Sequence, residues 1–175
     1  MRKCYGEPSD APHPFSCSWR PNDCVWHKTN HLVIHFRHMA EKGPMEGDKA
    51  PDFTLPEASE DIFVLSDLVK KGPVVLIFYP TDFGITCTVE FKKFNQMAGS
   101  FSEAGASLLG VSVSSTRSHR AWKEKLDLTI PLLSDADASV AKAYDVMSPE
   151  SSILKGHSTR AIFIVDRDQV IKYLS

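Results

Sequence analysis

The stretch Val74–Phe94, "VVLIFYPTDFGITCTVEFKKF", decides the fold, because an apolar run passes a proline and a glycine into a helical pattern. The run Pro73–Tyr79 has the length and continuous apolarity of a strand buried on both faces. A helix is predicted from about Thr86 to near Gly105. Its apolar residues recur at helical spacing: Val89, Phe94, Met97 and Phe101. The stretch therefore predicts a strand that leads directly into a helix, with Cys87 at the junction.

The sequence on both sides continues this alternation of strands and helices. "DFTLP" and "DIFVL" read as short strands, and "SDLVKKG" as a short helix with Ser66 as N-cap and Gly72 just past its end. "SLLGVSVS" and "IPLLSD" read as strands, "SHRAWKEKL" and "ADASVAKAYDV" as helices. "AIFIVDRDQVIKYL" reads as a hairpin that turns at Asp166–Gln169. We expect an α/β fold with a central mixed β-sheet flanked by helices.

Composition excludes several classes of protein. The chain has 175 residues, enough for one domain with a real core, and its net charge of −2 offers no footprint for nucleic acid or an anionic membrane. No apolar run approaches the roughly 20 residues that span a bilayer, and no secretory leader is recognisable. Three of the four cysteines lie in the first 24 residues, so no disulfide framework is predicted. A reducing cytoplasm is the expected location.

The chain changes character near Met45. Residues 1–44 are rich in His, Pro and Cys and show no sustained period, so we expect a poorly ordered extension there. Residues 45–175 form the predicted domain, and Met45 itself is a second candidate start. Zinc binding by Cys24, His27, His31 and His35 is an alternative function for the extension, but their spacing matches no standard zinc module.

Cys87 follows a strand and lies in or next to the first turn of the predicted helix. Unpaired backbone N–H groups and the positive end of the helix dipole converge there, and they favour a thiolate over a thiol. A buried structural thiol is the alternative, because free cysteine is among the most buried residue types. Position alone leaves a reactive and a structural Cys87 both open.

The segment "FYPTDFGITCTVE" resembles the active-site stretch of the peroxiredoxins, which reads Phe-Tyr-Pro-x-x-x-Thr-x-x-Cys. The resemblance covers about residues 46–173. It continues in family order through "GDKAPDFTLP", "LLGVSVSS", "SHRAWKEK", "IPLLSDADASVAKAYDV" and "RAIFIVDRD". It points to the alkyl hydroperoxide reductase and thiol-specific antioxidant type. It implies a thioredoxin-like fold and a thiol-dependent peroxidase for hydrogen peroxide and alkyl hydroperoxides.

The same resemblance assigns roles to individual residues. Cys87 matches the peroxidatic cysteine and Pro80 the proline that shields it. Arg160 matches the arginine that holds the thiolate and polarises the peroxide, and Glu90 an acidic residue that supports this arginine. Trp122 matches an aromatic position near the substrate. A guanidinium with fixed donors suits both the thiolate and the charge that develops on the leaving oxygen.

One position departs from the family pattern. Gly84 stands three residues before Cys87, where the family usually has a Thr or Ser whose hydroxyl binds the thiolate and the peroxide. Gly84 and Thr86 are still expected beside the substrate, and Thr81, Thr86 or a water could replace the hydroxyl. The runner-up function is therefore a catalytically weak relative that acts as a peroxide sensor or scaffold.

The oxidised Cys87 needs a second thiol. Some peroxiredoxins carry it five residues further along the helix, where this chain has Lys92, and others near the C-terminus. We expect a one-cysteine or bacterioferritin-comigratory-like mechanism, with an external thiol or a thioredoxin- or glutaredoxin-like reductant as partner. Cys4, Cys17 and Cys24 remain an alternative. We expect no metal and no cofactor, a homodimer or larger homo-oligomer, and treat a C-terminal truncation as open.

Overall fold

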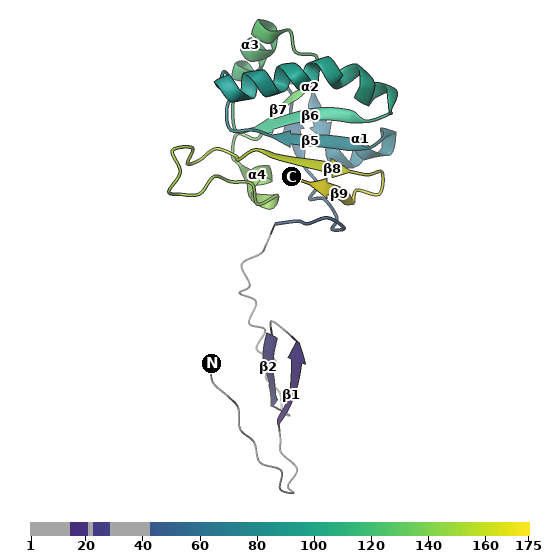
Figure 1. Ribbon diagram of the computed structural model, residues 1–175, viewed down its shortest axis with the longest axis vertical. Helices are drawn as coiled ribbons and strands as arrows, with labels where there is room; N and C mark the ends of the chain where they lie inside the picture. The colour runs from purple at the N-terminus through teal and green to yellow at the C-terminus, as the bar shows by residue number, and fades with distance from the viewer. Residues whose placement is uncertain (1–14, 21–22, 29–42) are drawn as a thin grey trace, which may run out of the picture. The chain divides into compact units, whose positions relative to one another are not determined.

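The computed structural model describes residues 15–20, 23–28 and 43–175 (Figure 1). The chain divides into two compact units, Met1–Ala40 and Glu41–Ser175. In the first unit, strands β1 and β2 occupy the first two of these described ranges and pair as an antiparallel hairpin. The sequence analysis did not predict this hairpin, and its division of the chain near residue 44 stays a prediction.

The second unit is built on a five-stranded sheet in the order β7-β6-β5-β8-β9 (Figure 1). Its strands are β5 (Val74–Phe78), β6 (Ser107–Ser112), β7 (Leu132–Ser134), β8 (Ala161–Val165) and β9 (Ile171–Leu174). Strands β5, β6 and β7 are parallel, whereas β8 is antiparallel to both β5 and β9. The sheet is therefore mixed, as predicted. None of the helices in the described part of the chain has the length and apolarity needed to cross a bilayer.

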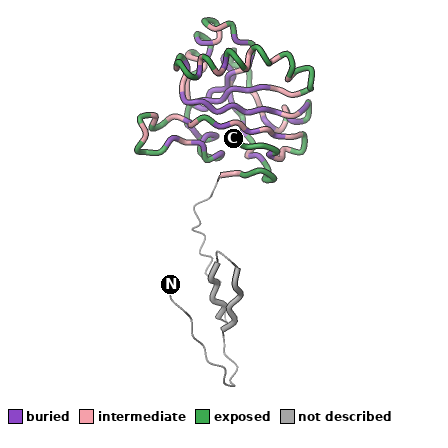
Figure 2. The backbone as a smooth tube through the Cα atoms, viewed as in Figure 1, coloured by how far each residue is buried: buried purple, intermediate pink, exposed green. Residues whose placement is uncertain are grey.

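Strand β5 is the central strand of the sheet, and all of its residues are buried (Figure 2). Val74, Leu76 and Phe78 belong to one apolar cluster, and Val75, Ile77 and Tyr79 to the other. Helices α1 (Leu65–Lys71) and α4 (Ser139–Ala143) contribute to the first cluster. Helices α2 (Ile85–Glu103) and α3 (Thr116–Leu126) contribute to the second. Alternation along the strand thus produces a helix–sheet–helix sandwich.

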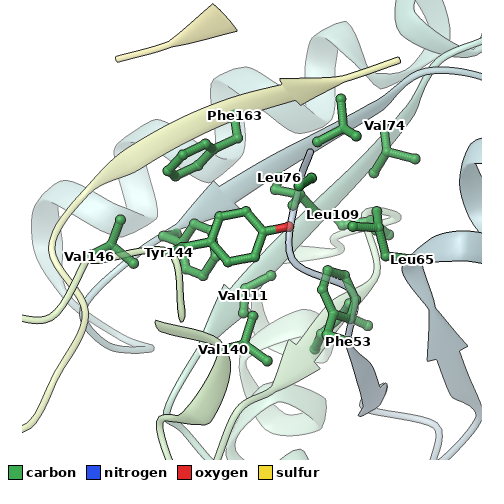
Figure 3. Close-up of a cluster of buried hydrophobic side chains, with 14 of the residues drawn as sticks. Phe53, Leu65, Val74, Leu76, Leu109, Val111, Val140, Tyr144, Val146 and Phe163 are labelled. Atoms are coloured by element: carbon green, nitrogen blue, oxygen red, sulfur yellow. The ribbon is translucent and has the colours of Figure 1, made fainter. Parts of the chain in front are cut away.

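The first cluster contains the aromatic rings of Tyr144 and Phe163, which Figure 3 shows among its aliphatic side chains. The rings of Tyr144 and Phe163 meet edge to face with centroids 5.0 Å apart, and Phe78 lies 5.2 Å from Tyr144. The Tyr144 hydroxyl donates to the Pro51 carbonyl at 2.8 Å. This cluster fixes the face of the sheet that is opposite α2.

Helix α1 begins differently from the prediction. It follows the hairpin of β3 (Thr54–Pro56) and β4 (Ile62–Val64), so that Val64 is its N-cap residue and Ser66 lies inside its first turn. The Ser66 N–H donates to the carboxylate of Asp52 at 3.0 Å. The predicted Ser66 cap is therefore wrong, because a carboxylate 14 residues away takes that role. Gly72 ends the helix as predicted.

Helix α2 turns a different stripe towards the sheet than the one predicted. Val89 and Met97 are half exposed, whereas Phe91 is fully buried. Phe94 and Phe101 do pack against the second cluster, as predicted. The buried positions recur every three or four residues from Cys87: Cys87, Phe91, Phe94, Ala98 and Phe101. Thus Cys87 lies on the buried face of the helix.

A largely buried ion pair ties α3 to the β3–β4 hairpin. The Lys123 ammonium contacts the Glu57 carboxylate, which also accepts from the backbone N–H groups of Ser59 at 2.6 Å and Leu132 at 3.2 Å. Burial alone raises the pKa of Glu57, but Lys123 and the two N–H donors offset it and hold this pKa at about 2. Glu57 is therefore charged at neutral pH.

Gly110 of β6 allows α2 to lie close to the sheet. A Cβ atom built at Gly110 would lie 2.8 Å from a ring carbon of Phe91 and 2.7 Å from a methyl carbon of Leu132. Both neighbours are fully buried and have no free space to move into. Position 110 therefore has to lack a side chain for α2 to pack this close to the sheet. Since Phe91 lies one turn after Cys87 on α2, the same packing bears on where Cys87 lies.

We predict that Gly110→Ala lowers the free energy of unfolding by about 1–3 kcal/mol, because the added methyl overpacks the core. The control is Gly99→Ala on the exposed face of α2, where a Cβ atom meets nothing within 4 Å. That variant should be about 0.5–1 kcal/mol more stable than the parent, since alanine is the better helix former. Urea unfolding of the three proteins measures both effects. Equal stability of the two variants would contradict the prediction.

Candidate active site

The candidate site lies where β5 ends and α2 begins, as the sequence predicted (Figure 1). Gly84 is the N-cap residue of α2, and Cys87 is the third residue of the helix. The Thr88 N–H donates to the Gly84 carbonyl at 2.8 Å, which starts the helical hydrogen bonds. The amides that precede Thr88 have no helical acceptor, so they direct partial positive charge towards the cysteine.

Cys87 is buried, with 1% of its surface exposed. It belongs to the apolar cluster that also contains Tyr79, Phe91 and Trp122. Burial in apolar surroundings agrees with the structural alternative for a cysteine, so the decisive observation is its polar neighbour.

That neighbour is Arg160. One guanidinium nitrogen of Arg160, Nη2, donates to the sulfur of Cys87 at 3.3 Å. Arg160 lies 73 residues further along the chain, directly before β8. The antiparallel pairing of β5 with β8 places Ala161 opposite Phe78, which brings Arg160 to the edge where α2 begins. A cation in contact with the sulfur favours a thiolate over a thiol.

Glu90 holds the other side of the guanidinium. Its carboxylate lies 3.3 Å from Nε of Arg160, while the arginine side chain is 42% exposed and the glutamate 28%. Glu90 lies three residues after Cys87 on α2. The same helix therefore carries both groups that contact Arg160, and the ion pair orients the guanidinium towards the sulfur.

Pro80 lies buried at the end of β5, and two side chains fix the backbone around it. His157 Nδ1 donates to the Pro80 carbonyl at 2.9 Å, and the Ser158 hydroxyl donates to the Tyr79 carbonyl at 2.7 Å. Neither His157 nor Ser158 was singled out from the sequence. Both lie just before Arg160, so one segment holds the strand end and supplies the guanidinium.

Gly84 has an ordinary backbone conformation, with φ −62° and ψ 136°. A Cβ atom built on it would lie 3.4 Å from the Cys87 sulfur and 3.5 Å from the methyl carbon of Thr81. These are van der Waals distances, so a side chain fits here and would touch the sulfur. The Thr81 hydroxyl does not replace the missing one, because it donates to the Asp82 carbonyl at 3.1 Å.

Two further predicted site residues lie outside this constellation. Thr86 is exposed on the first turn of α2. Trp122 is fully buried and stacks on Tyr79 with centroids 5.4 Å apart, and its Nε1 has no hydrogen-bond partner. The structure thus joins Cys87 with Arg160 and Glu90, while substrate contact by Thr86 and Trp122 stays a prediction.

The structure adds a polar group that the sequence analysis missed. The Asp82 carboxylate accepts from the Tyr79 hydroxyl at 2.9 Å, from the Ser118 hydroxyl at 2.5 Å and contacts His119 Nδ1 at 3.1 Å. Asp82 lies inside the quoted motif, but its partners on α3 are 36 and 37 residues away. Neither period nor spacing in the sequence signals a contact of that kind.

The charges in this group are fixed by their neighbours. Burial alone raises the pKa of Asp82, but the hydrogen bonds and charge of His119, with Ser118 and Tyr79, lower it below its usual value. Burial also raises the pKa of Tyr79, and the charges of Asp82 and Cys87 act in the same direction. Asp82 is therefore a carboxylate and Tyr79 a neutral donor at pH 7.

The other sequence hypotheses concern the first unit. Cys4, His31 and His35 lie outside the described residues, and of Cys17, Cys24 and His27 only the backbone, in β1 and β2, is described. Zinc binding there, and a resolving role for those cysteines, stay predictions. Among the residues with described side chains, no group of three or more His, Cys, Asp or Glu side chains could hold a metal ion.

Comparisons with known proteins agree with this geometry. Residues 46–174 match the AhpC/TSA family. The chain is 36% identical over 140 residues to a chloroplastic 2-Cys peroxiredoxin of Hordeum vulgare, covering 74% of this chain and 65% of that protein. It is 38% identical over 127 residues to a putative peroxiredoxin of Coxiella burnetii, covering 71% and 83%. The chain thus spans less than two thirds of the chloroplastic relative.

Solved structures give the same answer. The peroxidoxin BcpB of Mycobacterium tuberculosis matches with a TM-score of 0.68 and 33% identity, covering 75% of this chain and 85% of that one. The bacterioferritin comigratory protein of Xanthomonas campestris, studied for its alkyl peroxide reduction activity, matches with a TM-score of 0.65 and 27% identity, covering 70% and 79%. These matches confirm the predicted thioredoxin-like fold. The chain belongs to the AhpC/TSA family, the peroxiredoxins.

Proposed function

We propose that this chain is a thiol-dependent peroxidase that reduces hydrogen peroxide and alkyl hydroperoxides at Cys87. The contact between Arg160 Nη2 and the Cys87 sulfur carries the proposal, because it places a permanent cation on a thiol at a helix N-terminus. The family and the alkyl peroxide reduction named for the Xanthomonas campestris relative support it.

The first step is an attack of the Cys87 thiolate on one peroxide oxygen. The sulfur–oxygen bond forms as the oxygen–oxygen bond breaks, the sulfur is oxidised to sulfenic acid, and the alcohol or water leaves with a proton. Negative charge moves from sulfur to the leaving oxygen during this step. The exposed guanidinium of Arg160 and the free amides at the start of α2 stabilise that charge.

The second step needs a thiol from outside the domain. Cys87 is the only cysteine among residues 43–175, and Lys92 lies exposed on α2 at the position of the helical second cysteine. An external thiol attacks the sulfenic acid and releases water, and a second thiol then reduces the mixed disulfide. A thioredoxin- or glutaredoxin-like protein fits this role.

The remaining properties follow from the same proposal. The enzyme needs a compartment that maintains reduced thiols, and we propose the cytoplasm, although the Hordeum vulgare relative is named chloroplastic. We also propose a homodimer or a larger homo-oligomer. No nucleic acid and no membrane is part of the proposed reaction.

We expect one equivalent of hydrogen peroxide to add one oxygen atom to Cys87, because this thiol alone contacts a guanidinium in the described domain. Intact mass with a sulfenic-acid trap measures it, and peptide mapping assigns the oxygen to a cysteine. Cys87→Ser is the control and should remain unmodified at that peptide. Oxidation confined to other cysteines in the parent protein would refute the proposal.

Arg160→Lys should slow the oxidation of Cys87 by roughly tenfold to a hundredfold, which corresponds to one charge-assisted hydrogen bond of about 1.5–3 kcal/mol. Lysine keeps the charge but lacks the planar fork that contacts sulfur and Glu90 together. Stopped-flow oxidation measures the rate, with Arg167→Lys on the β8–β9 turn as control. A rate within twofold of the parent would remove Arg160 from the mechanism.

Gly84→Thr should accelerate the oxidation, with a ceiling of about tenfold to a hundredfold, because it adds a hydroxyl next to the sulfur. The negative φ of Gly84 accepts threonine without strain, and a hydroxyl at this N-cap adds a few tenths of a kcal/mol of stability. Gly84→Val is the matched control, since it fills the same space without a hydroxyl. If both variants react equally fast, the chain has already replaced the hydroxyl, and the weak-enzyme alternative loses its basis.

A further inference from the structure

The polar group of Tyr79, Asp82, Ser118 and His119 takes no part in the reaction described above. All four of its polar side chains meet in the interior, where His119 is 0% and Asp82 1% exposed in its side chain. The group joins three separate elements: the segment after β5, the first turns of α3 and, through His119, strand β7.

Both ring nitrogens of His119 lie at hydrogen-bond distance from oxygen atoms in the interior. Nε2 lies 3.2 Å from the Leu133 carbonyl oxygen, which can only accept. Nδ1 lies 3.1 Å from each oxygen of Asp82, which is ionised. Nδ1 also lies 3.2 Å from the Tyr79 hydroxyl. The ring of His119 therefore bridges Asp82 and strand β7 at a place without access to water.

The backbone beside Asp82 is strained. Phe83 has φ +59°, in the left-handed region that few residues other than glycine adopt. A conformation of this kind costs on the order of 1 kcal/mol and persists only when its surroundings fix it. Phe83 reverses the chain between Asp82 and Gly84, so this turn sets where α2 begins and hence where Cys87 lies.

The same group reaches the cysteine through packed rings. Tyr79 donates to Asp82, and its ring lies 4.6 Å from that of Phe91 and 5.4 Å from that of Trp122. Phe91 lies one turn after Cys87 on α2, and all of these belong to one apolar cluster. Movement of Asp82 is thus transmitted by the backbone through Phe83 and by the core through Tyr79.

We propose that Asp82 and His119 form a positioning pair that keeps the first turn of α2 closed, so that the Cys87 sulfur stays on Arg160. The pair contributes little as a source of stability, because the cost of burying its polar groups cancels most of what their hydrogen bonds gain. Its specific effect is on geometry: three side chains, Tyr79, Ser118 and His119, converge on one carboxylate only when the Pro80–Gly84 segment is in place.

Asp82→Asn tests the proposal in the full chain. Asparagine has the size of aspartate, but its amide NH2 group is itself a donor and would face the donors that now bind the carboxylate. We expect this to release the Pro80–Gly84 segment. Glu57→Gln is the matched control: it also removes a buried carboxylate that holds a side chain of α3, but it does not contact the Pro80–Gly84 segment. Ser118→Ala, which removes one donor to Asp82, serves as the milder variant if Asp82→Asn does not fold.

Two measurements on Cys87 separate positioning from stability. Hydrogen exchange of the peptide amides at residues 84–91 reports the opening of the first turn, and alkylation of Cys87 by iodoacetamide, read by peptide mass, reports access to the sulfur. In Asp82→Asn we expect both to accelerate by about tenfold relative to Glu57→Gln, because only the first variant opens this turn. Ser118→Ala should shift both in the same direction by less.

Equal exchange and alkylation in Asp82→Asn and Glu57→Gln would overturn the proposal, since the pair would then act only on global stability. The functional part rests on the proposed peroxidase: oxidation by hydrogen peroxide should slow in Asp82→Asn while alkylation accelerates, because the sulfur leaves Arg160. If the parent protein itself does not react with peroxide, the proposed function fails. Exchange and alkylation still decide the positioning role in that case.

Discussion

The register between β5 and β8 is the constraint on which the site depends. Phe78 lies opposite Ala161. Arg160, the residue before Ala161, therefore lies beside the segment that joins the end of β5 to the start of α2. Arg160 shares its sheet face with Ile162, which packs against the cluster around Cys87. A slip of one residue would turn the guanidinium to the other face of the sheet and leave the buried sulfur without its cation. The apolar alternation that forms the core therefore also brings Cys87 and Arg160 together.

Several features around Cys87 and Arg160 fix the geometry of the site, and some of them lower the stability of the fold. Phe83 adopts a left-handed conformation, and the polar side chains of Asp82 and His119 are buried beside it. Gly110 leaves a space that Phe91 fills, which keeps α2 close to the sheet. The first two features cost free energy taken alone. Together the three fix the end of β5 and the beginning of α2, and with them the place of Cys87 relative to Arg160.

Local sequence patterns predicted the strands and helices well, but they did not predict the contacts between side chains that lie far apart in the sequence. The continuous apolar run of β5 and the hairpin of β8 and β9 depend on neighbouring residues, and both were readable. Cys87 was singled out by its place at the junction of strand and helix, Arg160 was named by resemblance, and the structure joins them across 73 residues. The capping of α1 by Asp52 and the pairing of Asp82 with His119 depend on tertiary contacts with no periodic signal. Val89 and Met97 were misplaced because apolar composition does not define the rotation of a helix.

The burial of Cys87 places two opposing demands on the site. In the proposed reaction a peroxide, which is small, approaches along the exposed guanidinium of Arg160, so a sulfur that is 1% exposed is still within its reach. The thiol of a protein reductant carries its own backbone and cannot reach a sulfur beneath the first turn of α2. In the proposed reaction, reduction of the sulfenic acid therefore needs that turn to open, whereas oxidation needs it closed. The segment from Pro80 to Gly84 has to hold Cys87 firmly enough for the first step and release it for the second. The strained backbone at Phe83 lowers the free-energy cost of opening this segment. The hydrogen bonds to the Asp82 carboxylate define the closed state, so the two features together meet both demands.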